Sequence, residues 1–207
     1  MILKNFIVFE GIDGAGTSTQ IKRLAEHFDN DKIFVTAEPT TAETGKFLRR
    51  MLKDDFKVDE KTAAFLFAAD RSEHIFGKGG IIDQTEKGKI VISDRFYDST
   101  TAYQGAARKL ASNDVQWLNN FATEGLSPDL TIILDTPVEE GLRRANKRDD
   151  NNADRMGAQK KSFYEDVRSA FLKLAQQFPE RIVVVSAMGS KEETFEKIVA
   201  VVESKIK

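Results

Sequence analysis

Five short apolar runs predict the strands of a buried parallel sheet. The runs are continuous rather than alternating and are rich in β-branched and aromatic residues, as expected for strands that are covered on both faces. They are FIVFE (6–10), KIFVTAE (32–38), KIVISD (89–94), LTIILD (130–135) and RIVVVSA (181–187).

Helical patterns lie between these runs. Apolar residues at 21, 24, 25 and 28 follow the spacing i, i+3, i+4 and i+7, so one stripe of this helix is expected to pack on the sheet. Thr136, Pro137 and Glu139 occupy the N-cap, N1 and N3 positions of another helix, which is predicted to begin at about Val138. The alternation predicts a three-layer α/β/α fold with a five-stranded parallel sheet.

Two regions depart from this alternation. Segment 43–88 has three helical stretches, at about 43–54, 60–76 and 79–87, and is predicted to build a substrate-binding face. Segment 143–157, RRANKRDDNNADRMG, has few apolar residues and both signs of charge, which is typical of an exposed, mobile loop. Neither a repeat nor a linker divides the chain, so residues 1–207 are expected to form a single domain.

Composition narrows the classes of partner. The 31 Lys and Arg residues nearly balance 33 Asp and Glu, which favours neither a nucleic-acid-binding nor a membrane-binding surface. The absence of cysteine excludes disulfides and thiolate metal sites, and the apolar run 6–9 is too short for a signal segment or membrane span. We therefore expect a cytoplasmic protein that binds no nucleic acid and no membrane. His27 and His74 are too far apart to suggest a metal pair, and each is expected at a helix surface or boundary.

The segment GIDGAGTST follows a predicted strand and precedes an amphipathic helix. Its first and third glycines have the spacing of a phosphate-binding loop, in which backbone N–H groups converge on a phosphate at a helix N-terminus. Ser18 has the position of the Mg²⁺-binding hydroxyl in such loops. A glycine-rich turn without a ligand is the alternative. The residues expected to hold the nucleotide phosphates are Gly11, Ile12, Asp13, Gly14, Ala15, Gly16, Thr17, Ser18 and Thr19.

Thr17 stands where this kind of loop carries a lysine. The backbone cradle survives the substitution, but a charge-assisted hydrogen bond, worth about 1.5–3 kcal/mol, is lost. Basic residues of the segment 143–157 are candidates to replace the charge if that segment closes over the phosphates as a lid. Alternatively, they form a solvated helix end balanced by nearby acids. The candidates are Arg143, Arg144, Lys147, Arg148 and Arg155.

Seven motifs follow one another along nearly the whole chain. They are FEGIDGAG (9–16), EPT (38–40), TGxxxR (44–49), LFAADR (66–71), SDRFYDSTTAYQG (93–105), PDLTIILD (128–135) and a basic segment that ends in DR (154–155). Together they resemble the thymidylate kinase family. The resemblance implies a P-loop fold of the nucleoside-monophosphate kinase type with a mobile lid, usually as a homodimer. It also implies phosphorylation of dTMP to dTDP with ATP and Mg²⁺, for dTTP and DNA precursor synthesis.

Residues one helical turn apart are suited to read a base. Phe67 and Arg71 are at i and i+4, where a ring can stack on a base and a guanidinium can hydrogen-bond its edge. Thr100 and Gln104 repeat this spacing, and a primary amide has the donor and acceptor that a pyrimidine edge requires. The resemblance implies that Tyr103 crowds the 2′ position and selects deoxyribose. Alternatively, Phe67 is an ordinary core residue, and Tyr103 is an ordinary half-buried tyrosine.

Charged residues at the ends of strands are suited to bind phosphate and metal. Asp94 ends the third strand and is expected to hold Mg²⁺ through water, while Arg95 and Arg49 grip the acceptor phosphate. An ordinary Asp-Arg surface pair is the alternative at 94–95. By the resemblance, Asp13 faces the acceptor sugar and phosphate, and Glu38 is an acceptor-site carboxylate. Because phosphoryl transfer needs positioning more than covalent help, neither acid is assigned as an essential base.

Two departures from the family pattern bear on catalysis. Bacterial members usually read Arg-Glu-Pro-Gly-Gly where this chain has AEPTT at 37–41, so one basic group near the acceptor phosphate is absent. Gly14 stands where some members place an arginine, and members without that arginine usually keep a catalytic one in the lid. Arg144 or Arg148 is therefore the expected lid group, and acts beside Asp13 and Arg95.

Two other functions stay open at this point. One is a kinase for another monophosphate such as dUMP, because a methyl pocket contributes only about 1–3 kcal/mol to discrimination. The other is a catalytically impaired nucleotide-binding protein, which the substitutions at Thr17 and Ala37 motivate.

Overall fold

The structure is a computed structural model that describes residues 1–28, 30–148 and 158–205. Strands and helices alternate along most of it, as the pattern of apolar runs predicts. The elements are β1 (Ile2–Glu10), α1 (Thr17–His27), η1 (Asn30–Lys32), β2 (Ile33–Ala37), α2 (Glu43–Leu52), α3 (Glu60–Phe76), α4 (Ile81–Glu86), β3 (Ile90–Asp94), α5 (Tyr97–Thr100), η2 (Thr101–Ala107), α6 (Ser112–Thr123), β4 (Ser127–Asp135), α7 (Val138–Arg148), α8 (Ala158–Gln177), β5 (Ile182–Ser186) and α9 (Lys191–Lys205).

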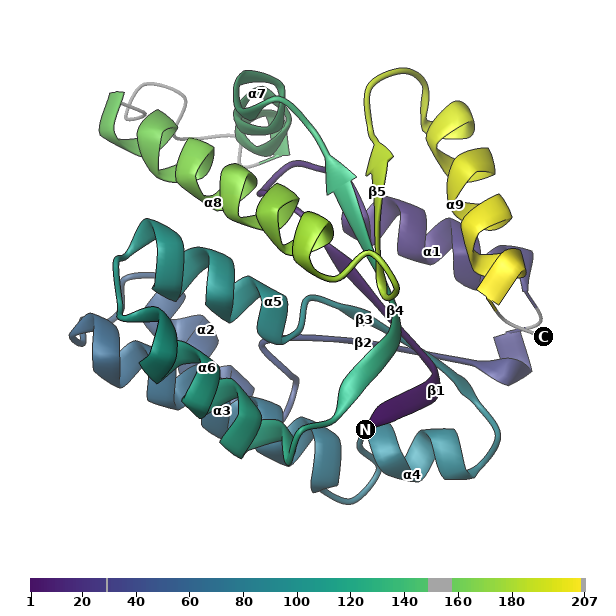
Figure 1. Ribbon diagram of the computed structural model, residues 1–207, viewed down its shortest axis with the longest axis horizontal. Coiled ribbons are helices and arrows are strands. Elements are labelled where there is room, and N and C mark those ends of the chain that lie inside the picture. The colour runs from purple at the N-terminus through teal and green to yellow at the C-terminus, as the bar shows by residue number, and fades with distance from the viewer. Residues whose placement is uncertain (29, 149–157, 206–207) are drawn as a thin grey trace.

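The five strands form one parallel sheet in the order β2-β3-β1-β4-β5 (Figure 1). The predicted five-stranded parallel sheet is therefore confirmed. Two strands are longer than their apolar runs, because β1 begins at Ile2 and β4 at Ser127, and these two residues pair with each other. The added N-terminal part of β1 is mostly exposed, which explains why no continuous apolar run marks it.

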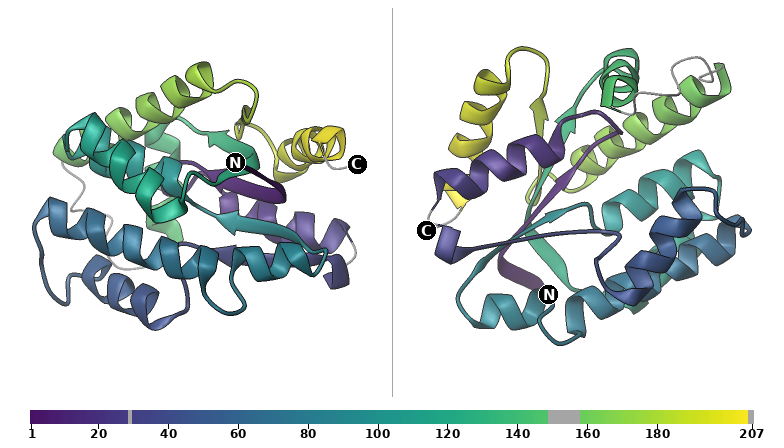
Figure 2. Two further views of the ribbon diagram at one scale, coloured as in Figure 1. Left: turned by 60° about the horizontal axis from the view of Figure 1, so that its bottom comes forward. Right: turned by 180° about the vertical axis from the view of Figure 1, so that it is seen from behind.

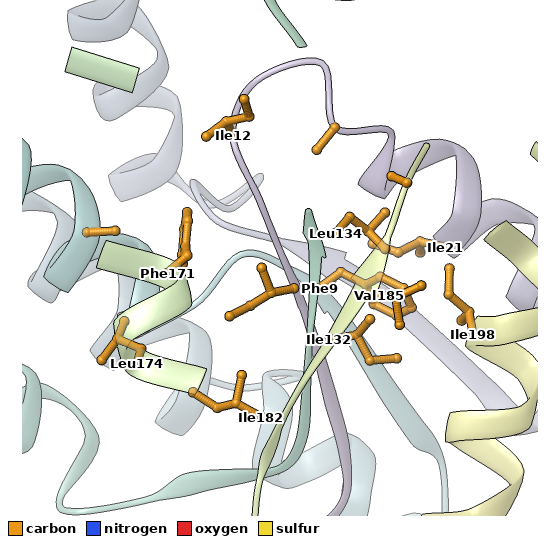
Figure 3. Packing of buried hydrophobic residues seen from close by; sticks show 14 of the residues in the cluster. Phe9, Ile12, Ile21, Ile132, Leu134, Phe171, Leu174, Ile182, Val185 and Ile198 are labelled. Atoms are coloured by element: carbon orange, nitrogen blue, oxygen red, sulfur yellow. The ribbon is translucent and has the colours of Figure 1, made fainter. Parts of the chain in front are cut away.

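Helices cover both faces of the sheet. On one face α1 and α9 lie side by side, while α8 and α4 contact the other (Figures 1 and 2). Figure 3 shows Phe171 and Leu174 of α8 on one side of the strands, and Ile21 of α1 and Ile198 of α9 on the other. The order helix, sheet, helix confirms the three-layer architecture and leaves the carboxyl ends of the strands free for a site.

The structure can be compared with the predictions for the two segments that depart from the alternation, 43–88 and 143–157. Segment 43–88 contains the three predicted helices, α2, α3 and α4, before β3 begins. α7 begins at Val138, as its capping sequence predicts. The predicted mobile loop 143–157 is wrong for residues 143–148, which form the last turns of α7. Residues 149–157 of the predicted lid lie outside the described residues. No helix in the described ranges has the length and apolar character needed to cross a membrane.

Candidate active site

The loop between β1 and α1 has the backbone of an anion-binding turn. Gly14 and Gly16 have φ values of 81° and 98°, which a residue with a Cβ rarely adopts. The N–H of Ala15 donates to the carbonyl of Ile12 at 3.0 Å and closes the turn. α1 then begins at Thr17, so its first N–H groups have no partner within the helix. These donors and the helix dipole favour a phosphate at this end of α1.

Gly14 brings the phosphate loop into backbone contact with α7. A Cβ on Gly14 would lie 2.0 Å from the carbonyl oxygen of Gly141, and a Cβ on Gly141 would lie 2.9 Å from the carbonyl oxygen of Asp13. A Cβ on Gly16, in contrast, would meet no atom within 4 Å. The loop is therefore packed against α7 at Gly14 and open at Gly16, where phosphate has room. In this structure the contact leaves no space for a side chain at position 14.

Ser18 and Asp94 meet beside the phosphate loop. The Ser18 hydroxyl donates to Oδ2 of Asp94 at 2.6 Å, which joins the first turn of α1 to the end of β3. A hydroxyl and a carboxylate are oxygen ligands of the type that Mg²⁺ takes, usually together with substrate phosphates. The two predicted metal residues are thus together, and their donor set fits Mg²⁺. Within the described ranges, no three His, Asp or Glu side chains cluster as a ready metal site.

A cavity of about 940 Å³ opens next to the phosphate loop. Its walls come from the phosphate loop, the β2–α2 connection, the α2–α3 connection, α3, the segment after β3, and α8. The cavity therefore joins the phosphate loop to the predicted substrate-binding face. The predicted site residues in its wall are Asp13, Glu38, Phe67, Arg71, Arg95, Thr100, Tyr103 and Gln104.

Arg49 takes a different place from the other predicted acceptor residues. Its guanidinium donates to the carbonyl oxygens of Pro39 and Thr40, the latter at 3.4 Å, and Arg49 does not line the cavity. It therefore braces the loop after β2 in this structure. Its predicted grip on the acceptor phosphate stays a prediction.

Arg95 links the cavity to the phosphate loop. Its Nη2 donates to Oδ1 of Asp13 at 2.8 Å, and its guanidinium carbon lies 5.1 Å from the ring centre of Tyr103. Burial alone would lower the pKa of Arg95, but Tyr103 and the acidic side chains of Asp13, Glu10 and Asp94 raise it above its usual value. Arg95 thus stays a cation and lies between the phosphate loop and the cavity.

Two tyrosines lie beside the ion pair between Asp13 and Arg95. The hydroxyl of Tyr164, on α8, donates to Oδ2 of Asp13 at 2.5 Å. Burial and the charge of Asp13 raise the pKa of Tyr164, and burial raises the pKa of Tyr103 to about 12. Both phenols therefore stay protonated. Sequence reasoning missed Tyr164, because its partner Asp13 is 151 positions away.

Glu10, at the end of β1, is a second residue that sequence reasoning missed. It is 0% exposed, and its carboxyl group accepts from the backbone N–H groups of Phe96 (2.9 Å) and Ser99 (3.1 Å). Ser99 also places its hydroxyl 2.5 Å from Oε2 of Glu10. Burial raises the pKa of Glu10 to about 8, although nearby Arg95 lowers it. Glu10 holds the turn in which Arg95 has a φ of 77°.

His74 lies in the last turn of α3, near the helix boundary, but it is buried, so the expectation of a helix-surface position is wrong. Its Nδ1 is 3.1 Å from Oε1 of Glu38, and its Nε2 is 2.7 Å from the hydroxyl of Thr36. Glu38 in turn accepts two hydrogen bonds from Arg71, at 3.0 and 2.8 Å. The buried face of α3 thus holds His74, only three positions after Arg71 in the helix.

The basic residues of α7 are paired with acids and backbone. Arg143 and Arg144 both donate to Glu140, and Arg144 also reaches the carbonyl of Ala187 at 3.3 Å. These two guanidinium groups lower the pKa of Glu140 to about 2. Arg148 is the last residue of α7, and the placement of its side chain is not described. The lid roles of Arg144 and Arg148 stay predictions.

Comparison with known proteins agrees with this geometry. Residues 9–198 match the family model described as thymidylate kinase. A thymidylate kinase of Pediococcus pentosaceus is 38% identical over 204 residues, which cover 96% of this chain and 97% of the relative. One from Staphylococcus epidermidis is 40% identical over 204 residues, with 95% and 98% covered. The crystal structure of thymidylate kinase from Ehrlichia chaffeensis superimposes with a TM-score of 0.73 at 28% identity, covering 96% of this chain and 97% of that one.

Proposed function

Since the chain belongs to the thymidylate kinase family and phosphorylates dTMP, we propose that Mg·ATP supplies the phosphoryl group and that transfer takes place beside Asp13 and Arg95. One observation carries this proposal. The 2.8 Å ion pair between Asp13 and Arg95 joins the phosphate loop to the acceptor cavity, so donor and acceptor phosphates can meet there. Positioning and charge stabilisation are the main requirements of phosphoryl transfer.

On the donor side, the loop 11–19 binds the ATP phosphates through its backbone N–H groups. Ser18 and Asp94 would hold the magnesium ion, Asp94 through water. When bound, Mg²⁺ neutralises charge on the phosphate oxygens. Thr17 offers a hydroxyl but no charge, so we assign the missing positive charge to the lid residues Arg144 and Arg148. For Arg144 this requires release from Glu140 as the lid closes.

On the acceptor side, the cavity wall provides groups for each part of dTMP. The ring of Phe67 stacks on the base, and Arg71, Thr100 and Gln104 hydrogen-bond its edge. Tyr103, which lies against Arg95 in the cavity wall, crowds the 2′ position of the sugar and so selects deoxyribose. Arg95 grips the acceptor phosphate, assisted by Arg49 once it leaves its carbonyl partners. Asp13, held by Arg95 and Tyr164, faces the sugar and phosphate.

The test is steady-state formation of dTDP from dTMP with Mg·ATP, repeated with EDTA and with dUMP as acceptor. We expect turnover that requires the divalent cation and a higher kcat/KM for dTMP than for dUMP. Activity that is unchanged in EDTA would contradict the role of Mg²⁺. Equal kcat/KM values for dTMP and dUMP would favour the broader nucleotide kinase.

We also propose that the chain forms a homodimer. Trp117 and Phe121 on α6 stack with ring centres 5.4 Å apart and are 60% and 71% exposed, and Phe65 on the adjacent α3 is also exposed. Exposed apolar patches of this kind mark association surfaces. Light scattering on the purified protein should give the mass of a dimer, and Phe121→Glu should give a monomer. A monomeric unsubstituted chain would contradict the dimer.

We place the activity in the cytoplasm, because its nucleotide substrates are water-soluble metabolites. Fractionation of source cells should recover dTDP formation with the soluble fraction. Recovery with the membrane fraction would contradict this location.

A further inference from the structure

A series of hydrogen bonds, partly buried at Thr36 and fully buried beyond it, leads from β2 to the base-reading end of the cavity. It begins at Thr36, passes through His74 and Glu38, and reaches Arg71. Glu38 and Arg71 line the cavity, whereas Thr36 and His74 do not. The Glu38, Arg71 and His74 side chains are at most 5% exposed, so solvent cannot substitute for a lost partner.

The hydrogen-bond partners of His74 indicate which of its two ring nitrogens donates to Glu38. Glu38 is a carboxylate paired with the Arg71 cation, so Nδ1 of His74 must carry the proton that it donates to Oε1. In the neutral ring, Nε2 then accepts from the Thr36 hydroxyl. His74 is thus oriented from both sides, by Glu38 at Nδ1 and by Thr36 at Nε2.

The pairing of Glu38 with Arg71 has an unusual form. Arginine and carboxylate commonly form a fork in which each oxygen accepts from a different nitrogen. Here Oε2 alone accepts from both Nε and Nη2 of Arg71, and Oε1 is occupied by His74. The His74 contact therefore sets the rotation of the carboxylate. Without that contact, Glu38 is free to turn and offer both oxygens to Arg71.

Arg71 has little spare hydrogen-bonding capacity. A guanidinium has five N–H donors, and Arg71 uses four of them, two on Glu38 and one each on Thr100 and Asn119. The remaining donor is on Nη1. A rotation of Glu38 would pull the guanidinium with it and change the direction of this last donor.

We propose that His74 is a positioning residue for pyrimidine recognition, which acts through Glu38 to hold Arg71 toward the base. This inference rests on the proposed base contact of Arg71. The recognised group is an acceptor at the base edge, such as the exocyclic carbonyl oxygen that thymine has and cytosine replaces with an amine. His74 therefore contributes to the preference for dTMP over dCMP, although it touches neither.

Two near-isosteric substitutions separate positioning from packing. The amide nitrogen of asparagine reaches about as far as Nδ1 of histidine, and the amide oxygen of glutamine reaches about as far as Nε2, where it can accept from the Thr36 hydroxyl. His74→Asn therefore keeps the donor to Glu38 and loses Thr36, whereas His74→Gln keeps Thr36 and loses Glu38. His27→Gln on the surface helix α1 is the matched control, since its ring has only a surface ion pair with Glu203 and ring contacts.

The measurements are calorimetric affinity for dTMP without ATP, kinetics with dTMP and dCMP, and the thermal midpoint of each variant. We expect His74→Gln to weaken dTMP binding about tenfold and to reduce the preference over dCMP, which is less than the roughly hundredfold cost that a misplacement of 1 Å can have. We expect His74→Asn and His27→Gln to bind dTMP like the unsubstituted chain, and the KM for ATP to stay constant. Equal dTMP affinity in His74→Asn and His74→Gln would overturn the proposal.

Arg71→Lys distinguishes this inference from the proposed site on which it rests. If Arg71→Lys weakens dTMP binding while His74→Gln does not, the result supports the contact of Arg71 with the base and refutes the positioning role of His74. If Arg71→Lys leaves dTMP affinity and the discrimination against dCMP unchanged, the result refutes both the contact of Arg71 with the base and the positioning role of His74.

Discussion

The hydroxyl of Ser18 and the carboxylate of Asp94 are 2.6 Å apart, although they belong to different elements and lie 76 positions apart in the chain. Parallel strands bring their carboxyl ends to one edge of the sheet, and β3 lies beside the strand that leads into the phosphate loop. The two oxygens form the proposed magnesium site.

Asp94→Asn tests the metal role of this pair. The amide keeps the shape of the side chain but removes its charge, so we expect kcat/KM to fall about a hundredfold or more and the Mg²⁺ concentration for half-maximal rate to rise. The measurement is the rate of dTDP formation as Mg²⁺ is titrated. Asp129→Asn, which loses only an ion pair with exposed Lys4, should leave both values unchanged. Asp94→Asn with an unaltered Mg²⁺ dependence would refute the assignment.

Gly14→Ala tests the contact between the phosphate loop and α7. The new Cβ would meet the carbonyl oxygen of Gly141, so we expect about 1–3 kcal/mol of overpacking in addition to the strain of a positive φ. We also expect the KM for ATP to rise, because the loop is displaced. Gly88→Ala is the matched control, with a φ of 77° and open space around the Cβ, and should lose only about 1–2 kcal/mol.

Urea unfolding and ATP kinetics of the two glycine variants provide the measurement. Equal stability losses and an unchanged KM for ATP would mean that the loop moves away from α7 without consequence.

Glu10→Gln tests the buried carboxyl group under Arg95. Its pKa is about 8 in the folded chain and near 4.5 when unfolded, so between these pH values the folded state binds the extra proton. This contribution is fully present below pH 4.5 and is lost as the pH rises through 8. We therefore expect the stability advantage of the unsubstituted chain over Glu10→Gln to fall, by on the order of a few kcal/mol, across this range.

The measurement is urea unfolding of both proteins from about pH 5 to pH 8. Glu26→Gln on the exposed surface of α1 serves as the control and should show the same pH dependence as the unsubstituted chain. Parallel stability curves for the unsubstituted chain and Glu10→Gln would contradict the buried titration.

Much of the fold could be predicted because its signals are local. Continuous apolar runs marked all five strands, and the capping residues before Val138 marked the start of α7. The cavity residues Phe67, Arg71, Thr100 and Gln104 were found by helical spacing and by resemblance.

The rest of the site depends on contacts that sequence spacing does not reveal. Glu10 is an acid at the end of an apolar run, and its partners Phe96 and Ser99 come from the segment that follows the neighbouring strand β3. Tyr164 and His74 reach acids that are 151 and 36 positions away. Arg49 was expected at the acceptor phosphate because its motif matched, but the carbonyls after β2 hold it in this structure. Long-range partners of this kind follow from topology rather than from local pattern.

The most direct test of the account is steady-state dTDP formation from dTMP and Mg·ATP by the unsubstituted chain and by Thr17→Lys in one assay. We predict turnover of about 1–100 s⁻¹ for the unsubstituted chain and little gain, or a loss, with lysine, because the site is built around threonine and takes its positive charge from the lid. Turnover near zero that Thr17→Lys restores would contradict the account. It would show that the fold is that of a kinase but that catalytic activity was lost together with the lysine of the phosphate loop.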